Sequence, residues 1–336
     1  MIERLTLALL VIFGLAVLFD YINGFHDTAN AIATSVSTRA LRPEYALLLS
    51  AVANFVGALT GTAVAETIGS GIVSVPSGSE GQLIVVAALI GAIVWNLVTW
   101  WFSIPSSSSH ALIGGLLGAG IASAGLTAVH VGAFVEKVVV PLVTSPLIGL
   151  GGGFVLMVVL LNVFRHANPH RLNDRFRRLQ LLSAAYMAFS HGSNDAQKTM
   201  GIMTAALVAA GIIPNFRVPL GVIVLAAGAI SFGTAAGGWR IIRTMGQRVV
   251  KLDPVHGFAA ETTAATVILG ASHLGMPVST THVISSAIMG VGASDRFASV
   301  HWGLARNIVW AWILTIPAAA LVAGAARLTL RLVLGA

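Results

Sequence analysis

Long stretches without a single charged side chain dominate this sequence and restrict what it can fold into. They cover residues 45–65, 81–135, 138–164, 199–216, 218–239, 262–294 and 307–326. A helix that crosses a bilayer needs roughly 20 apolar residues, so 81–135 is long enough for two crossings. Two shorter apolar runs, 5–19 and 179–194, each lead into a polar cluster. We predict an all-α, polytopic membrane bundle in which some of about ten hydrophobic segments turn back before crossing.

The composition excludes most other classes of protein. Of the 336 residues, 56% are hydrophobic and 9% are charged, whereas a soluble domain carries about 25% charged residues. A soluble enzyme, a disordered chain and a nucleic-acid module are therefore excluded, although the net charge is +7. The apolar run behind Glu3 and Arg4 lacks a small-residue cleavage site, so we expect a retained helix.

The longest polar interruption, residues 165–178, carries five arginines against one aspartate. Short basic loops stay on the cytoplasmic side of a membrane, which predicts a multi-pass protein of the cell membrane with this loop in the cytoplasm. The basic segment 240–251 is assigned to the same side.

Two motifs recur in the same order at nearly the same spacing. "GFHDTAN" at 24–30 matches "GSNDAQK" at 192–198, which pairs Asp27 with Asp195 at an offset of 168. "PSSSSH" at 105–110 matches "PVSTTH" at 277–282 at an offset of 172, which Gly118 and Gly290 share. A common offset for two separate motifs indicates an internal duplication.

The duplication divides the chain into a first transmembrane repeat, 1–164, the basic loop 165–178, and a second transmembrane repeat, 179–336. Repeated halves are typical of secondary transporters, which hold substrate and ions at the repeat interface near the midplane. Inverted halves require an odd number of crossings between equivalent points, and the segment count leaves this parity open.

An ionised aspartate inside a membrane is costly and marks a functional site by default. Asp27 has Asn30 on its helix face, and Asp195 has Asn194 and Gln197 beside it. Carboxylate and amide oxygens suit a small hard cation, and a buried aspartate can also carry a proton. Alternatively, each aspartate caps a helix or pairs with a neighbour, as Lys198 allows for Asp195.

The serine-rich motifs predict helices that restart inside the membrane, because serine and threonine favour helix N-caps and proline favours helix starts. A helix N-terminus with free N–H groups and several hydroxyls is suited to an oxyanion. Alternatively, the hydroxyls only satisfy helix backbone in lipid. The candidate anion ligands are Ser107, Ser108, Ser109, Ser279, Thr280 and Thr281.

With these motifs the sequence resembles the inorganic phosphate transporter (PiT) family over nearly its whole length. The resemblance is carried by "NGFHDTANAIAT" at 23–34, "PSSSSHALIGG" at 105–115, "SHGSNDAQKTMGI" at 190–202, "GGWRIIRTMG" at 237–246 and "PVSTTHVISSAIMG" at 277–290. It implies two inverted repeats with re-entrant hairpins, phosphate contacts from the six hydroxyl residues, and cation or proton roles for Asp27, Asn30, Asn194 and Asp195. His26, Gln197 and Lys198 are secondary candidates.

Many family members have Asn-Asp where this chain has His26-Asp27. The histidine form resembles the proton-coupled bacterial branch, some of which carries metal–phosphate complexes, so the coupling ion is H⁺ or Na⁺ and a metal remains unassigned.

We therefore expect a secondary active transporter, not an enzyme, that imports inorganic phosphate by cation symport with alternating access and needs no cofactor. A sulfate or other oxyanion symporter is the alternative, and an anion channel ranks below it. A hydrolase built on Ser109 and His110 ranks lowest, since adjacent residues on a helix pair poorly and no G-x-S-x-G motif is present. The expected partners are phosphate, the coupling ion and the bilayer, with no nucleic acid; a homo-oligomer stays open.

Overall fold

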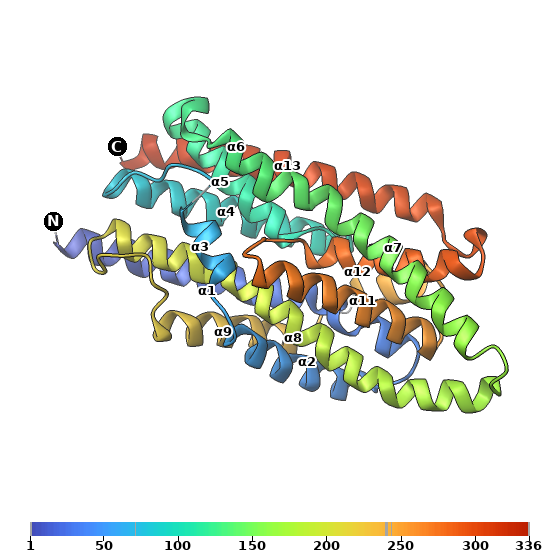
Figure 1. Ribbon diagram of the computed structural model, residues 1–336. Coiled ribbons are helices and arrows are strands. Elements are labelled where there is room, and N and C mark those ends of the chain that lie inside the picture. Colours follow the sequence, from blue (N-terminus) through green and yellow to red (C-terminus); the bar gives the residue numbers. More distant parts are fainter. Residues whose placement is uncertain (1, 71, 239–240, 243, 335–336) are drawn as a thin grey trace.

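The computed structural model describes residues 2–70, 72–238, 241–242 and 244–334, and within these ranges the chain is helical (Figure 1). The main helices are α1 (Ile2–Ser37), α2 (Pro43–Ala58), α3 (Ala63–Ser70), α4 (Ser79–Trp101), α5 (Ser108–Ala124), α6 (Val131–Phe134), α7 (Val140–Val163), α8 (Pro169–Ala209), α9 (Leu220–Ala236), α11 (Pro254–His273), α12 (Thr280–Asp295) and α13 (Trp302–Leu334). Four short 3₁₀ or π turns join them at Gly125–Ala128, Val135–Val139, Thr244–Arg248 and Phe297–Ser299. The described residues form one isolated β-bridge, between Val73 and Val129, and the all-α prediction is confirmed. Within the family-like motif 237–246, residues 239, 240 and 243 lie outside the described residues.

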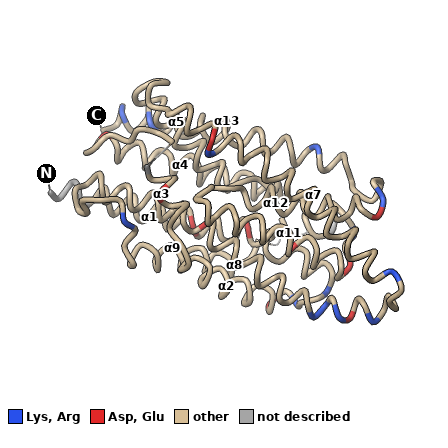
Figure 2. The backbone as a smooth tube through the Cα atoms, viewed as in Figure 1, with Lys and Arg blue, Asp and Glu red and all other residues tan. Residues whose placement is uncertain are grey.

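Five helices in the described chain are long and apolar enough to cross a membrane. They are Leu7–Ser37, Ser79–Trp101, Ser108–Ala128, Val131–Val163 and Trp302–Leu334. Helices α2 and α3 form a sixth candidate that is bent by 73°. Charged side chains gather at the two ends of the molecule and are sparse between them (Figure 2), as the hydrocarbon layer requires.

The structure divides the predicted apolar segments differently in two places. The runs 179–194 and 199–216 lie largely on the single 41-residue helix α8, which continues through Asp195 and Lys198. The prediction of a loop over 165–178 is wrong beyond residue 168, because Asn168 caps α8 and Pro169 begins it. The continuous run 262–294 is split between α11 and α12. Charge-free runs therefore identify the apolar segments but not the ends of the helices. A buried ion pair can lie inside one helix, and a turn between two helices can lack charged residues.

Helices α4 and α5 form one hairpin, and α11 and α12 form another. At the base of the first, Glu80 on α4 accepts a hydrogen bond from Ser123 on α5 and pairs with Arg327 on α13 at 2.5 Å. At the base of the second, His256 Nε2 on α11 lies 2.7 Å from Asp295 Oδ2 on α12. In each hairpin the start of the first helix thus meets the end of the second helix, so the turn that joins the two helices lies at the opposite end, the tip of the hairpin.

Helices α1 and α8, which carry the two acidic motifs, pack together and run in opposite directions (Figure 1). The matched glycines Gly24 and Gly192 allow other helices to approach these motifs. A Cβ on Gly24 would lie 2.3 Å from the Ile230 carbonyl of α9, and one on Gly192 would lie 2.1 Å from the Asn54 carbonyl of α2. Only glycine fits such backbone contacts.

The two sequence halves are interwoven in space. Helix α1 packs on α9 and α8 on α2, while α5 packs on α13 and α12 on α7. The matched glycines Gly118 and Gly290 again sit at equivalent contacts, against the Ala320 carbonyl of α13 and the Leu150 carbonyl of α7. The predicted repeats 1–164 and 179–336 therefore contact each other through these four helix pairs.

Candidate ion and anion site

Both serine-rich motifs begin helices as the sequence predicts. Ser107 caps α5 by accepting the His110 backbone N–H at 3.2 Å, and Ser279 caps α12 by accepting the His282 N–H at 3.2 Å. Pro105 and Pro277 lie in the non-helical approach, two residues before each cap. The two helix starts meet in the interior, where the Ser109 hydroxyl donates to the Val278 carbonyl at 3.3 Å.

The two aspartates lie in the middle of long helices, both buried, at these helix starts. Asp27 is 2% exposed and Asp195 is 0% exposed. Thr280 Oγ1 lies 3.5 Å from Asp27 Oδ2 and 3.4 Å from Asp195 Oδ2, so one hydroxyl stands between both carboxylates. Neither aspartate caps a helix, and this excludes one of the alternatives for both residues.

In the first half, His26 and Asn30 flank Asp27. The imidazole Nδ1 of His26 lies 2.6 Å from Asp27 Oδ1, and its Nε2 lies 3.0 Å from the Thr99 hydroxyl of α4. Asn30 Nδ2 donates to Thr281 Oγ1 at 2.9 Å and to Thr280 Oγ1 at 3.3 Å. Because this amide occupies the lone pairs of the threonine oxygens, their hydrogens are directed to the carboxylates.

In the second half, Asp195 has two basic neighbours on its own helix. Lys198 Nζ lies 2.5 Å from Asp195 Oδ1, and His191 Nε2 lies 3.4 Å from Asp195 Oδ2. The predicted neighbours Asn194 and Gln197 make hydrogen bonds to other elements, while the Asn194 Oδ1 atom is buried without a partner among the described residues. Asn194 donates to Ser272 at 2.8 Å, and Gln197 accepts the Val64 backbone N–H at 2.8 Å, which ties α8 to α3.

Asp27, His191 and Asp195 bring one ligand atom each to within 4.8 Å of one another. Two carboxylates and an imidazole suit a divalent transition metal as well as a hard cation or a proton. The sequence prediction contained the two acids but missed His191, whose i, i+4 spacing to Asp195 placed it on the same helix face.

The hydroxyl residues differ in how they are used. Ser108 is buried, and its hydroxyl has no hydrogen-bond partner among the described residues. Ser109 accepts a hydrogen bond from Lys198. The rings of His110 and His282, which follow the two serine motifs, pack against each other with centroids 4.7 Å apart. A free buried hydroxyl at a helix start is what an anion ligand would use.

A second buried acid on α1 was also missed. Asp20 is 0% exposed, accepts a 2.7 Å hydrogen bond from Thr199 of α8, and has one oxygen without a partner in the described part of the chain. It lies seven residues, about two turns, before Asp27 and therefore on the same face.

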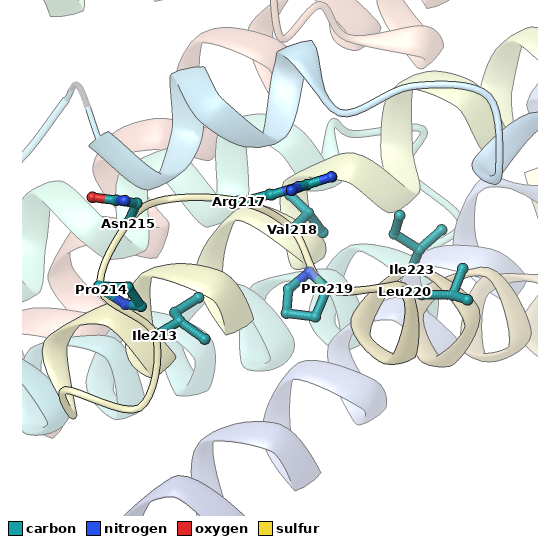
Figure 3. A pocket seen from close by; sticks show the side chains of 8 residues that line it. All are labelled: Ile213, Pro214, Asn215, Arg217, Val218, Pro219, Leu220 and Ile223. Atoms are coloured by element: carbon teal, nitrogen blue, oxygen red, sulfur yellow. The ribbon is translucent and has the colours of Figure 1, made fainter.

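A surface groove elsewhere contains none of these residues. It lies around the connection from α8 to α9 and is lined by Ile213, Pro214, Asn215, Arg217, Val218, Pro219, Leu220 and Ile223 (Figure 3). The groove is open and mainly apolar, so the chemistry remains with the buried cluster.

Known proteins match this arrangement closely. Residues 23–323 match the sequence profile of the Phosphate transporter family. The chain belongs to that family. It is 47% identical to the probable low-affinity inorganic phosphate transporter of Bacillus subtilis (strain 168), over 97% of both chains, and 48% identical to the protein of the same description from Rhizobium meliloti (strain 1021), over 94% of this chain and 96% of that one.

The fold also matches a solved structure entitled "The sodium-dependent phosphate transporter". The TM-score is 0.90 at 27% identity, over 97% of this chain and 99% of that one. This family member is therefore a phosphate transporter and a multi-pass membrane protein, not an enzyme. The resemblance drawn from the sequence motifs is confirmed.

Proposed function

We propose that this phosphate transporter imports inorganic phosphate by cation symport, with the coupling ion held by Asp27 and Asp195 and the anion held by the hydroxyls at the starts of α5 and α12. The observation that carries the proposal is the position of Thr280, whose single hydroxyl hydrogen is shared between both carboxylates at 3.4 and 3.5 Å.

This sharing gives a physical route to coupling. While the carboxylates hold no coupling ion, the hydroxyls of Thr280 and Thr281 are drawn toward them, and the negative charge of the carboxylates repels phosphate. A proton or metal cation on the carboxylates removes that charge and competes for the same oxygens. The threonine hydroxyls are then free to donate to phosphate, together with Ser108 and the backbone N–H groups of the two helix starts.

The electrical work of import supports coupling to more than one cation. Moving a phosphate dianion against 100 mV costs about 4.6 kcal/mol, at about 2.3 kcal/mol per charge. One monovalent cation leaves a net charge of −1, and two remove the penalty. Asp27 and Asp195 together can accept two positive charges, as two protons or as one proton and one metal cation.

We further propose that the halves are inverted repeats and that access alternates about the buried site. The antiparallel course of α1 and α8, and the equivalent helix contacts made by the matched glycines, support this. The hairpins α4–α5 and α11–α12 are then re-entrant from opposite faces of the cell membrane, with the basic segment 165–178, which includes the start of α8, in the cytoplasm.

Uptake of radiolabelled phosphate into proteoliposomes tests the proposal when the Na⁺ and pH gradients are varied independently. Concentrative uptake that requires one of the two gradients supports symport and identifies the ion. Uptake that follows only the phosphate gradient would make the protein a channel. Competition by excess sulfate or by a divalent metal, added separately, tests the substrate and its metal–phosphate form.

A further inference from the structure

The internal duplication places a different residue at the same position in each half. Three residues after the acid, the first half has Asn30 and the second has Lys198. Both side chains are 1% exposed. One half therefore has an amide beside its acid, whereas the other has an amine that pairs with its acid at 2.5 Å.

The surroundings of the Lys198 ammonium resemble those of a bound hard cation. Its Nζ lies 2.5 Å from a carboxylate oxygen of Asp195, 3.3 Å from the backbone carbonyl oxygen of Val278, and in hydrogen-bond contact with the hydroxyl of Ser109. Carboxylate, carbonyl and hydroxyl oxygens are the ligands that Na⁺ and other hard cations use. They come from α8, from the approach to α12 and from α5, so the ammonium joins both helix starts to the acid.

A buried charge is tolerated when it is paired and its hydrogen-bond donors are satisfied. An ammonium has three donors, and the three oxygens named above account for all of them. This match between donors and oxygens leaves no coordination position for an added ion beside Asp195 Oδ1.

We propose that the Lys198 ammonium permanently fills the cation position of the second half, so that this half assembles its anion site without Na⁺. The proposal rests on the proposed coupling role of the two acids. It assigns any exchangeable coupling ion to the side of the site formed by Asp27, Asp195 Oδ2 and His191, and it makes Lys198 the residue that determines the ion requirement of the second half.

The test replaces Lys198 by the residue at the equivalent position of the first half. Purified wild type, K198N and K198R are heated in detergent, and the apparent Tm is compared in NaCl and in choline chloride at equal ionic strength. K198N should gain a Na⁺-specific rise in Tm of a few degrees over wild type, because a ligand that binds the folded state stabilises it. K198R keeps the charge and should gain none, and the double variant K198N/D195N should lose the gain.

Folded, monodisperse K198N without any added Na⁺-specific stabilisation would overturn the proposal. If K198N does not fold, equilibrium binding of ²²Na⁺ to the wild-type protein in saturating phosphate decides: at most one Na⁺ per chain supports the proposal, and two overturn it. Neither measurement depends on transport, so the proposed symport can fail while this inference holds.

Discussion

Each threonine hydroxyl at the start of α12 can donate one hydrogen bond. In the proposed mechanism the aspartate carboxylates and phosphate compete for it. Thr281 Oγ1 lies 3.5 Å from Asp27 Oδ2, and Thr280 Oγ1 lies within 3.5 Å of both aspartates. At these lengths the bonds are weak, so transferring the hydroxyls to phosphate costs little. We regard these two side chains as the point where cation and anion binding meet.

Replacing Thr280 or Thr281 by valine keeps the volume and removes the hydroxyl. Each variant should raise the phosphate concentration for half-maximal uptake by about 10- to 100-fold, since a hydrogen bond to a charged group contributes roughly 1.5–3 kcal/mol and 1.4 kcal/mol is tenfold. Concentration-dependent uptake in proteoliposomes measures this. Thr266→Val, at an exposed position of α11, is the matched control; a T280V protein with wild-type phosphate dependence would exclude Thr280 from the anion site.

At the residue scale, the sequence alone could predict those residues of the buried cluster that recur in both halves. Asp27 with Asp195 and Ser107 with Ser279 could be predicted because each has a counterpart at a shared offset. Asp20 and His191 could not be found this way, since Ala188 and Asn23 stand at the equivalent positions. The hydrogen bond from the Asn194 amide nitrogen to Ser272 of α11 depends on tertiary packing that a single sequence does not contain.

At the scale of helices, close backbone contact fixes how α8 lies against α2. Gly192→Ala should lower the apparent Tm, because a Cβ there would lie 2.1 Å from the Asn54 carbonyl oxygen and overpacking costs about 1–3 kcal/mol. Gly228→Ala is the control: a Cβ at this position of α9 meets nothing within 4 Å, and alanine favours a helix by about 1 kcal/mol. Equal Tm values for G192A and wild type would show that α2 can move away from α8.

The base of the α11–α12 hairpin should respond to acid. Burial acts to raise the pKa of Asp253, but the bond and charge of His256 and two backbone N–H groups outweigh it and hold that pKa below the usual 3.8. A lowered pKa stabilises the fold above the unfolded value, and this stabilisation is lost as the pH falls through the lowered pKa. The Tm difference between wild type and D253N, which keeps the N-cap, should therefore shrink as the pH falls below about 3.8, the usual pKa of an aspartate. A difference that persists undiminished into stronger acid would contradict this.

Charge-free runs predicted the helices correctly where the charged residues that bound a run lie near the ends of helices. The prediction of two segments in 81–135 is met by the hairpin of α4 and α5. The prediction of helix ends from charge-free runs failed at α8, because Asp195 and Lys198 neutralise each other inside the helix. A count of charges treats such a pair as a polar break.

At the scale of the whole molecule, the buried cluster is enclosed by helices from both halves of the sequence. Helices of each half pack on helices of the other, so the acidic motif of one half lies at the hairpin tip of the other, as Asp27 does at Thr280. The sequence predicted paired motifs at a repeat interface, but the exchange of packing partners between halves could not be predicted from it, because it depends on contacts between residues far apart in the chain.

Uptake by Asp27→Asn and Asp195→Asn proteins tests the central claim most directly. Asp174→Asn, an exposed change near the start of α8, serves as the control in the same proteoliposomes. We predict that D27N and D195N each lose concentrative phosphate uptake by at least about tenfold, the cost of one charge-assisted contact, while D174N equals wild type. Wild-type concentrative uptake by both D27N and D195N would contradict the claim that these carboxylates couple the ion to phosphate.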